Sequence, residues 1–518
     1  MPFPIPSFLI KAAVWLAARW PWFGRKLNRF AINAAVNQCR HRPHPWSTVH
    51  SYVSWRSLTD RTYSARHLPE TDLPSDRLPD ISTILELFRR QQFRPCPKST
   101  CLFPAFAQYL TDGFIRTRMP HSSEPDEARL RLQNTSNHEI DLCPLYGRNV
   151  EQTRALRAVP QKQRKGRLRS VIHDNGEEFA DFLYDASGTV KPEFAVLDPP
   201  LIATKSLRNP GVYRHIFAFG GDRCNATPMV AAMNTLFLRE HNRLADLLTQ
   251  QNPDWDDDRV FETARNITIV LFIKIVVEEY INHISPSFRF IADPSVAWNA
   301  PWNKPNWITS EFSLLYRWHP LIPDQIRFGP TTWQSKELIS NNTPLLECGL
   351  QQTFLDLSSQ TAGQIGPFNT ATSLLDLESR AIQQGRLCKL APYADYKAYA
   401  SQNRPQSFSD ISKNPNVTEL LKKCYRTVDD VEFYVGLFAE DHVDESPLPP
   451  LLRTMVAVDA FSQALTNPLL SRHVYNTDTF TKTGLQIIEQ TTSLRDIVSR
   501  NSSAPIDSEG FIGMTRPL

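Results

Sequence analysis

The sequence predicts a mainly α-helical protein, with one large helical domain after an N-terminal amphipathic segment. Gly is scarce and Pro plentiful, at 18 and 40 of 518 residues, which disfavours a turn-dense β fold and suits helices joined by ordered loops. Several long stretches carry apolar residues at helical spacing, and the two-residue alternation of strands is almost absent. Hydrophobic residues make up 41% of the chain, which is enough for a large core.

Charge and cysteine content narrow the functional classes. The formal net charge is +3, so the chain lacks the overall basic character of a nucleic-acid-binding protein. The eight cysteines are scattered, and the closest pair, Cys96 and Cys101, has no matching second pair for a zinc site or a disulfide framework. We therefore expect mostly free, buried thiols and a reducing, cytoplasmic location.

Residues 1–45 differ from the rest of the chain. Lys11 and Arg19 interrupt the apolar run, so it lacks the ~20 uninterrupted apolar residues of a membrane span. No small-residue cleavage site follows a short apolar core, which argues against a signal peptide. Aromatic residues interleaved with Lys and Arg predict a helix that lies in a lipid headgroup layer as a monotopic, peripheral anchor. The alternative is an amphipathic helix docked on the protein's own core. Residues 46–518 are predicted to form the single large domain.

Within this domain, residues 60–100 are rich in Pro and Arg, which predicts a long loop with short helices. Residues 227–250 and Asp258–His283 are expected to be long helices, the second strongly apolar and therefore buried in the core. The helical spacing in the first of them is carried by Met229, Met233, Leu236, Phe237, Leu244 and Leu247.

The most informative segment is residues 311–324, with the sequence EFSLLYRWHPLIPD. Tyr316 and His319 stand three residues apart, which places them on one face of a helix that Pro320 would end or kink. Imidazole is a good ligand for iron, and a phenol beside it can give up an electron and a proton. The spacing alone is weak evidence, because such pairs are more often core residues or surface neighbours.

This segment resembles, nearly residue for residue, the cyclooxygenase stretch that carries the proximal haem histidine and the tyrosyl-radical residue. Cyclooxygenases belong to the animal haem peroxidase superfamily. The resemblance extends over roughly residues 5–500, and the N-terminal segment stands where that family keeps its membrane-binding helices. Further similar segments follow in the same order along the chain, at residues 50–69, 138–157, 236–248 and 252–285.

The resemblance implies a helical haem-peroxidase-like catalytic domain that binds haem b. His319 would coordinate the iron, and Tyr316 would carry the radical. His241, in the similar segment 236–248, would be structural, as it usually is in the superfamily.

The predicted distal helix departs from the family pattern. In FPAFAQYLTDGFIRT, residues 103–117, Gln108 matches the family, but Asp112 stands at the position of the distal histidine. A carboxylate can replace an imidazole in acid–base work only where burial and neighbouring charges suit its pKa. Asp112 and Gly113 alone would also suit a turn. We favour a helix, because apolar residues continue the helical spacing across the pair.

A second departure concerns the loop GGDRCNATP, residues 220–228. It is similar to the stretch of myeloperoxidase-like members that supplies a distal arginine over the haem. On this resemblance Arg223 would stabilise negative charge on the departing oxygen and pair with Asp112. The alternative is an ordinary arginine of a surface loop.

The segment VDAFSQALTNPL, residues 458–469, resembles the cyclooxygenase segment whose serine lines the fatty-acid channel. It nominates Ser462 for substrate binding, although the spacing to the following Asn-Pro is shorter here and a buried core serine is the alternative. The family's carboxylate-binding arginine should lie near Arg40 and Arg42, and neither is assigned.

The expected function is haem-dependent oxidation of an unsaturated fatty acid or related lipid. Oxidised haem, formed with peroxide, would oxidise Tyr316. The tyrosyl radical would remove a hydrogen from the lipid, and O₂ would add to the carbon radical. The alternatives are hydroxylation, desaturation or hydroperoxide isomerisation at the haem, a one-electron peroxidase for small phenols, and a haem-binding sensor. Expected partners are the lipid, O₂ or hydrogen peroxide, and a membrane surface. A homodimer is left open, and no nucleic acid is expected.

Overall fold

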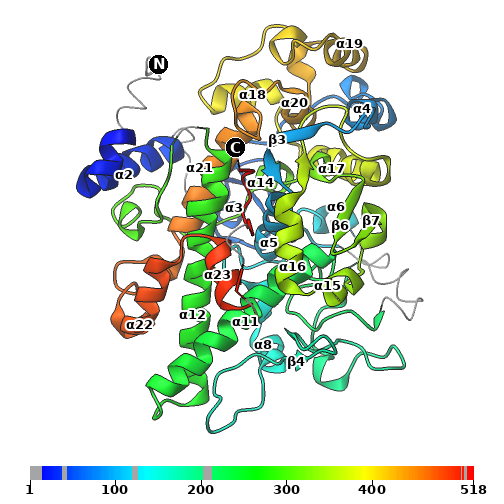
Figure 1. Cartoon of the computed structure of the whole chain (residues 1–518). Coiled ribbons are helices and arrows are strands. Elements are labelled where there is room, and N and C mark those ends of the chain that lie inside the picture. Colours follow the sequence, from blue (N-terminus) through cyan, green and yellow to red (C-terminus); the bar gives the residue numbers. More distant parts are fainter. Residues whose placement is uncertain are drawn as a thin grey trace.

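The computed structural model describes residues 14–37, 44–119, 126–201, 213–286, 288–502, 505–506 and 510–517. Helices dominate these residues, and their named strands form four two-stranded antiparallel sheets. The prediction of a mainly α-helical fold is confirmed (Figure 1).

The centre of the fold is a pair of long helices that pack along each other, α11 (Pro228–Gln251) and α12 (Asp257–Ile275). Both match predicted helices. Thr227 caps α11 by accepting a hydrogen bond from the backbone N–H of Val230, and Pro228 occupies the first helical position, where its missing N–H costs nothing. Most residues of α11 are buried, so this helix is enclosed by protein on nearly every side. Helix α5 (Leu102–Phe114) packs against it.

The predicted helix over Asp258–His283 is continuous, but it contains an irregular turn. After Ile275 the chain forms a π-helix over Val276–Ile281, and α13 (Asn282–Ile284) then completes the element. π-Turns inside α-helices are rare and occur frequently at functional sites.

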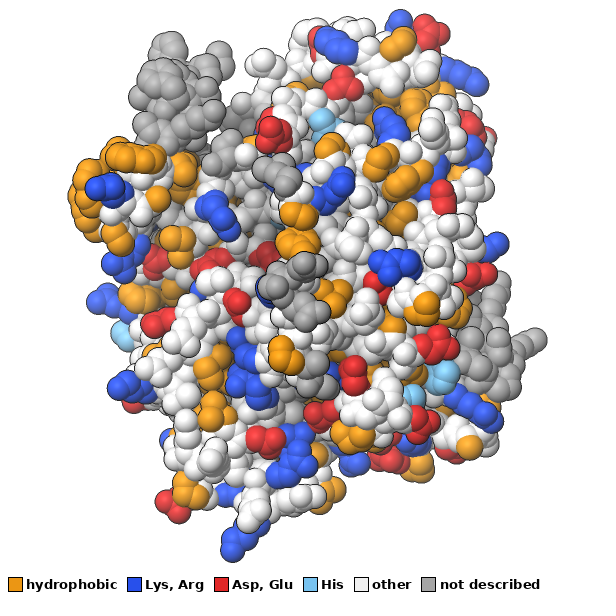
Figure 2. All heavy atoms as spheres, in the orientation of Figure 1, with side chains coloured by type: hydrophobic (Ala, Val, Ile, Leu, Met, Phe, Trp, Pro, Cys, Tyr) orange, Lys and Arg blue, Asp and Glu red, His pale blue; other side chains and the backbone are white. Residues whose placement is uncertain are grey.

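The N-terminal segment is helical over residues 14–19 and again in α2 (Pro21–Asn37). Ile32 and Val36 are buried, and α2 packs against α21 (Pro450–Leu465). Hydrophobic side chains also gather on the outer surface of α2 (Figure 2). One side of this segment is thus docked on the protein, while another exposes Trp15, Trp20, Trp22 and Phe30.

No helix in the described parts of the chain is long and apolar enough to span a bilayer. Lys11, Arg40 and Arg42 lie outside the described residues. The seven cysteines within them are free thiols, mostly buried, as predicted, and Cys39 is outside.

The remaining helices surround the central pair. They are α3 (Trp55–Thr59), α4 (Ile81–Phe88), α6 (Glu127–Leu130), α7 (Cys143–Tyr146), α8 (Val150–Leu156), α14 (Ser310–Leu315), α15 (Thr343–Cys348), α16 (Leu350–Ser359), α17 (Leu375–Leu387), α18 (Tyr393–Tyr399), α19 (Pro415–Cys424), α20 (Phe433–Ala439), α22 (Thr477–Gln490) and α23 (Leu494–Arg500). The strand pairs are β1 (Trp46–Ser47) with β2 (Ala65–Arg66), β3 (Pro95–Thr100) with β8 (Thr361–Gly363), β4 (Val171–Ile172) with β5 (Glu178–Phe179), and β6 (Gln325–Phe328) with β7 (Thr331–Gln334).

Candidate active site

Helix α5 places Gln108 and Asp112 one turn apart. The helix continues through Asp112 and Gly113 to Phe114, so these two residues do not form a turn, and the helical interpretation is confirmed. Every residue of α5 is buried except Gln108, which is partly accessible. A partly accessible polar side chain on a helix inside the core indicates an interior space on that side of α5.

The predicted contact between Asp112 and Arg223 is present. An Nη atom of Arg223 lies 3.7 Å from a carboxylate oxygen of Asp112, and it also donates to the backbone carbonyl of Ile115. Arg223 is therefore an interior-facing residue. Its loop is held against the end of α5 by Arg116, whose guanidinium forms a 3.0 Å ion pair with Asp222.

Burial raises the pKa of Asp112 to about 7, while the charge of Arg223 and a hydrogen bond from Gln108 act in the opposite direction. The second carboxylate oxygen, Oδ2, is buried and has no hydrogen-bond partner within the described part of the chain. A carboxyl group that titrates near neutrality and keeps one oxygen free can hold or accept a proton from a small molecule beside it.

Tyr316 and His319 do not lie on one helical face, and this part of the prediction is wrong. Helix α14 ends at Leu315, Tyr316 is its C-cap, and His319 opens a short 3₁₀-helix over His319–Leu321. Pro320 explains the break, because its ring disfavours the α conformation of the preceding residue and it has no N–H to donate. The directions of the Tyr316 and His319 side chains are therefore set by the non-helical turn between them.

The Tyr316 phenol is enclosed by aromatic rings. Its ring stacks on Trp318 with 4.8 Å between centroids and contacts Phe312 at the same distance. Burial raises the pKa of Tyr316, and the nearby Tyr280 opposes the rise. Tyr280 comes from the π-helical turn. The neutral phenol is therefore the stable form, and this form can give up a hydrogen atom.

His319 has a carboxylate partner that the sequence analysis missed. Its Nδ1 atom lies 3.1 Å from Oε1 of Glu378, a fully buried residue of α17, whereas 16% of the His319 side chain remains accessible. Since Nδ1 faces this carboxylate, Nε2 is the nitrogen left for a ligand. An imidazole nitrogen is a usual axial ligand of haem iron. This donor, together with the unpartnered Asp112 oxygen, fits a haem.

Arg317 connects the two acidic residues electrostatically. Burial lowers its pKa, the charge of Arg223 acts in the same direction, and the charges of Asp112 and Glu378 oppose them. The guanidinium thus lies within electrostatic reach of both carboxylates. Arg317 lies in the same segment as Tyr316 and His319. The sequence could not reveal its role, because the carboxylates near it come from the distant helices α5 and α17.

Ser462 is buried in α21, and its hydroxyl donates to the backbone carbonyl of Asp459 at 3.0 Å. Its role in substrate binding stays a prediction. Asp459 itself contacts His67 Nε2 at 3.0 Å and interacts electrostatically with Tyr316.

His241 is buried and hydrogen-bonded through both ring nitrogens, to the Tyr146 hydroxyl and the Gly166 carbonyl, at 2.9 Å each. These bonds give it a structural role, as expected.

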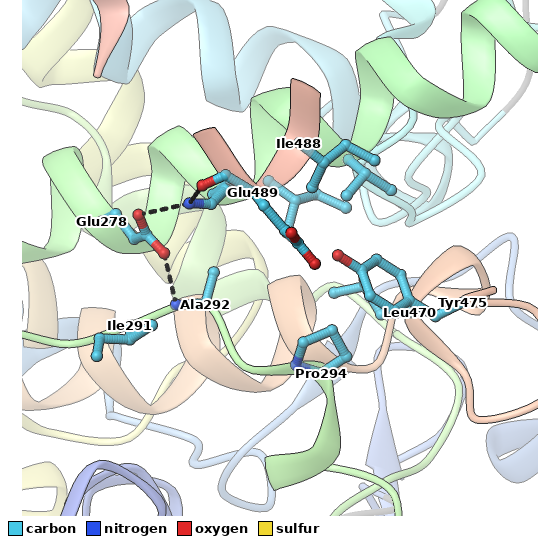
Figure 3. Close-up of a pocket in the computed structure, with 11 residues that line it drawn as sticks. Glu278, Ile291, Ala292, Pro294, Leu470, Tyr475, Ile488 and Glu489 are labelled. Carbon is cyan, nitrogen blue, oxygen red and sulfur yellow. Dashed lines mark hydrogen bonds and ion pairs between the residues drawn. The ribbon is translucent and has the colours of Figure 1, made fainter. Parts of the chain in front are cut away.

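A cavity of about 190 Å³ lies between α12, the π-turn and α22, and its lining includes Lys274, Glu278, Tyr475 and Glu489 (Figure 3). Figure 3 shows Glu278 bonded to the backbone of Ala292 on its wall. No predicted site residue lines this cavity.

The model of the family "Animal haem peroxidase" matches residues 113–509. Prostaglandin G/H synthase 1 from Mus musculus is 29% identical, over 96% of this chain and 81% of its own length. Prostaglandin G/H synthase 2 from Gallus gallus is 30% identical, over 89% and 74%. Among solved structures, the fatty acid alpha-dioxygenase of Oryza sativa superposes with a TM-score of 0.68 at 18% identity, covering 85% of this chain and 80% of that one. Peroxidase A from Dictyostelium discoideum superposes with a TM-score of 0.66 at 19% sequence identity, covering 86% of this chain and 92% of that one.

These matches establish the class of protein that the fold and the site define. The chain belongs to the animal haem peroxidase family. Within that family it is a cyclooxygenase-like haem oxidoreductase. The fold, cofactor and enzyme class expected from the sequence are confirmed.

Proposed function

We propose that this protein dioxygenates an unsaturated fatty acid or related lipid, with Tyr316 as the residue that abstracts hydrogen. The observation that carries the proposal is the setting of the Tyr316 phenol. It is enclosed by Trp318 and Phe312, interacts with Tyr280, and precedes His319 by three residues. The names of the relatives, prostaglandin synthases and fatty acid alpha-dioxygenases, support the lipid as substrate.

Haem held through His319 would supply the one-electron oxidation of Tyr316. The phenol releases its electron and its proton, and the resulting radical takes a hydrogen atom from an allylic carbon of the lipid. The lipid C–H bond breaks, the phenol O–H bond forms again, and O₂ adds to the carbon radical. The lipid peroxyl radical then takes the hydrogen atom back from the Tyr316 phenol, which gives a hydroperoxide and restores the tyrosyl radical. The aromatic enclosure keeps water from the phenol.

Asp112, Gln108 and Arg223 form the acid–base group on the α5 side. Asp112 accepts a proton from peroxide in its ionised form and returns it in its protonated form, since its pKa is about 7. Arg223 stabilises negative charge that develops beside it. Ser462 is proposed to contact the substrate.

The exposed aromatic side chains of residues 14–37 support attachment to a membrane surface, where a lipid substrate is concentrated. Guanidinium and ammonium groups lie over two of the rings, Arg19 over Trp15 at 6.0 Å and Lys26 over Trp22 at 5.2 Å. Aromatic rings with nearby cations suit the headgroup layer.

The deciding experiment is turnover of a fatty-acid panel with and without O₂, with products identified by mass spectrometry. Tyr316→Phe should keep bound haem and peroxide-dependent dye oxidation but lose the oxygenated lipid. Tyr109→Phe is the matched control, because it removes the hydroxyl of another buried tyrosine and should leave the product unchanged. Full lipid oxidation by Tyr316→Phe would reject the radical role and favour hydroxylation or desaturation at the haem.

A further inference from the structure

The carboxylate of Glu378 has an unusual setting. It comes from α17, is fully buried, and faces Nδ1 of His319 at 3.1 Å. Helix α17 packs against α14 on one side and α20 on another (Figure 1). No Lys or Arg in the described part of the chain lies within ion-pair distance of Glu378. Arg317 interacts with this carboxylate only over a longer distance. A buried carboxylate without an ion-pair partner is costly unless hydrogen-bond donors surround it.

Two hydroxyl groups are such donors, and the imidazole of His319 is the third polar neighbour. Thr370 Oγ1 donates to Oε1 of Glu378 at 2.7 Å, and the Tyr434 hydroxyl donates to Oε2 over a short distance. The remaining neighbour is Nδ1 of His319, 3.1 Å from Oε1. Its N–H is not aligned for a hydrogen bond in this structure, so the ring must turn slightly toward Oε1 and carry a hydrogen on Nδ1 to form one. That bond would select the tautomer with hydrogen on Nδ1 and the lone pair on Nε2.

We propose that Glu378 is a positioning residue that accepts a hydrogen bond from His319 and makes its imidazole a more electron-rich ligand for the haem iron, with Tyr434 setting how strongly it does so. The inference rests on the proposed role of His319 as the axial ligand. Histidine ligands commonly donate their second N–H to a carboxylate, which fixes the ring and raises its basicity.

Electron donation through His319 has a specific use in this chain. On the α5 side, a carboxyl group with a pKa of about 7 stands where the family keeps a histidine. Donation from the axial ligand is a second way to assist O–O cleavage. Glu378, acting through His319, would add to the help with O–O cleavage that the acid–base group of Asp112 gives.

Tyr434 allows a test in which two substitutions are expected to shift the electron donation of His319 in opposite directions. Its hydroxyl draws charge toward Oε2 of Glu378, so removing it leaves more charge on Oε1, where His319 donates. Glu378→Gln keeps the shape but removes the charge. The two substitutions should therefore change the ligand in opposite directions, which loss of packing alone would not do.

The experiment uses the full-length, haem-loaded protein. The readouts are the iron–histidine stretching band in the resonance Raman spectrum of the ferrous form and the Fe(III)/Fe(II) reduction potential. Glu378→Gln should lower the band frequency and raise the potential. A tenfold change in the ferric-to-ferrous preference corresponds to about 59 mV. Tyr434→Phe should raise the band frequency and lower the potential.

Glu432→Gln is the matched control. Glu432 is also a buried glutamate that accepts a hydrogen bond from a tyrosine, Tyr425, at 2.9 Å, but its cationic partner is Arg386, with no histidine. It should leave the band and the potential unchanged.

Wild-type values in both Glu378→Gln and Tyr434→Phe, or shifts in the same direction, would overturn the inference. If Glu378→Gln fails to bind haem, Tyr434→Phe decides alone: a shift to higher frequency supports the inference, and an unshifted band rejects it. An absent iron–histidine band in the wild-type protein would show instead that His319 is not the ligand, which separates failure of the proposed function from failure of this inference.

Discussion

Arg223 and Asp112 form an ion pair in which an Nη atom lies 3.7 Å from a carboxylate oxygen. Burial at this position disfavours the ionised form of Asp112. Burial alone would move the pKa of Asp112 further above its ordinary value, and the guanidinium charge holds it at about 7. Arg223 thus acts partly by keeping Asp112 able to ionise at physiological pH.

We expect the rate of peroxide-dependent dye oxidation to rise with pH through a midpoint near 7. Asp112 is protonated below its pKa, and only its ionised form can accept a proton from peroxide. In Arg223→Ala the charge that lowers this pKa is gone, so the midpoint should move to higher pH. The midpoint is measured from initial rates across pH 5–9, which covers roughly two pH units on each side of it. Asp112→Asn is the control and should show no such midpoint, and an unmoved midpoint in Arg223→Ala would contradict the assignment.

Replacing Asp112 by His should raise ordinary peroxidase turnover. Burial and the charge of Arg223 lower the pKa of an imidazole here, so it stays neutral and able to accept a proton at pH 7, where Asp112 is about half protonated. A well-placed acid–base group contributes about 10²-fold or more over a side chain that cannot accept a proton. Dye-oxidation rates at saturating peroxide measure the gain, with Asp112→Asn as the comparison that removes the carboxylate without adding a base. Equal rates for His and Asn at this position would show that proton transfer here does not limit turnover.

Replacing His319 by Ala should remove the axial ligand. We expect the Soret band to be lost or to shift to an unliganded form, because Nε2 is the one nitrogen of this ring that does not face Glu378. Added imidazole should restore much of the spectrum by entering the vacated space. His473→Ala, which changes an exposed histidine, should have the wild-type spectrum. A wild-type spectrum for His319→Ala would reject the ligand assignment.

Membrane attachment should depend on the exposed aromatics in α2 and just before it, and not on the docked side of α2. Replacing Trp20, Trp22 and Phe30 together by Ser should weaken binding to anionic liposomes at least about tenfold, since burying one large apolar side chain contributes about 1.5 kcal/mol. Flotation with liposomes measures it. Ser at Ile172 and Val443, each 71% exposed elsewhere on the surface, should have no effect. Equal flotation of the two sets would reject the membrane role of this segment.

Much of the helical framework could be predicted because apolar spacing is a local property of the chain. The helices around Gln108, Met233 and Phe272 lie where the sequence predicts them. The helical pairing of Tyr316 with His319 failed, although Pro320 was visible in the sequence. A proline restricts the residue before it as well as its own position, so the helix ends earlier than the proline itself.

Glu378 and Tyr280 could not be assigned from the sequence because their partners are far away along the chain. One signal for Glu378 was present. It stands at helical spacing with Leu375, Ala381 and Ile382, so it is a charged residue on the apolar face of an otherwise polar helix. A charge in that position needs a buried partner, but the sequence does not say that the partner is His319.

The π-helical turn at Val276–Ile281 limits which insertions and deletions this part of the chain can accept. A π-turn accommodates one more residue than a regular α-helical turn, so the residues on its two sides are offset by about 100° around the axis. That offset lets Glu279 accept from the backbone of Leu494 while Tyr280 meets Tyr316. Losing a single residue here would restore a regular helix and turn the tyrosine away from its partner, with the composition of the core almost unchanged. In this stretch, chain length is under tighter constraint than residue identity.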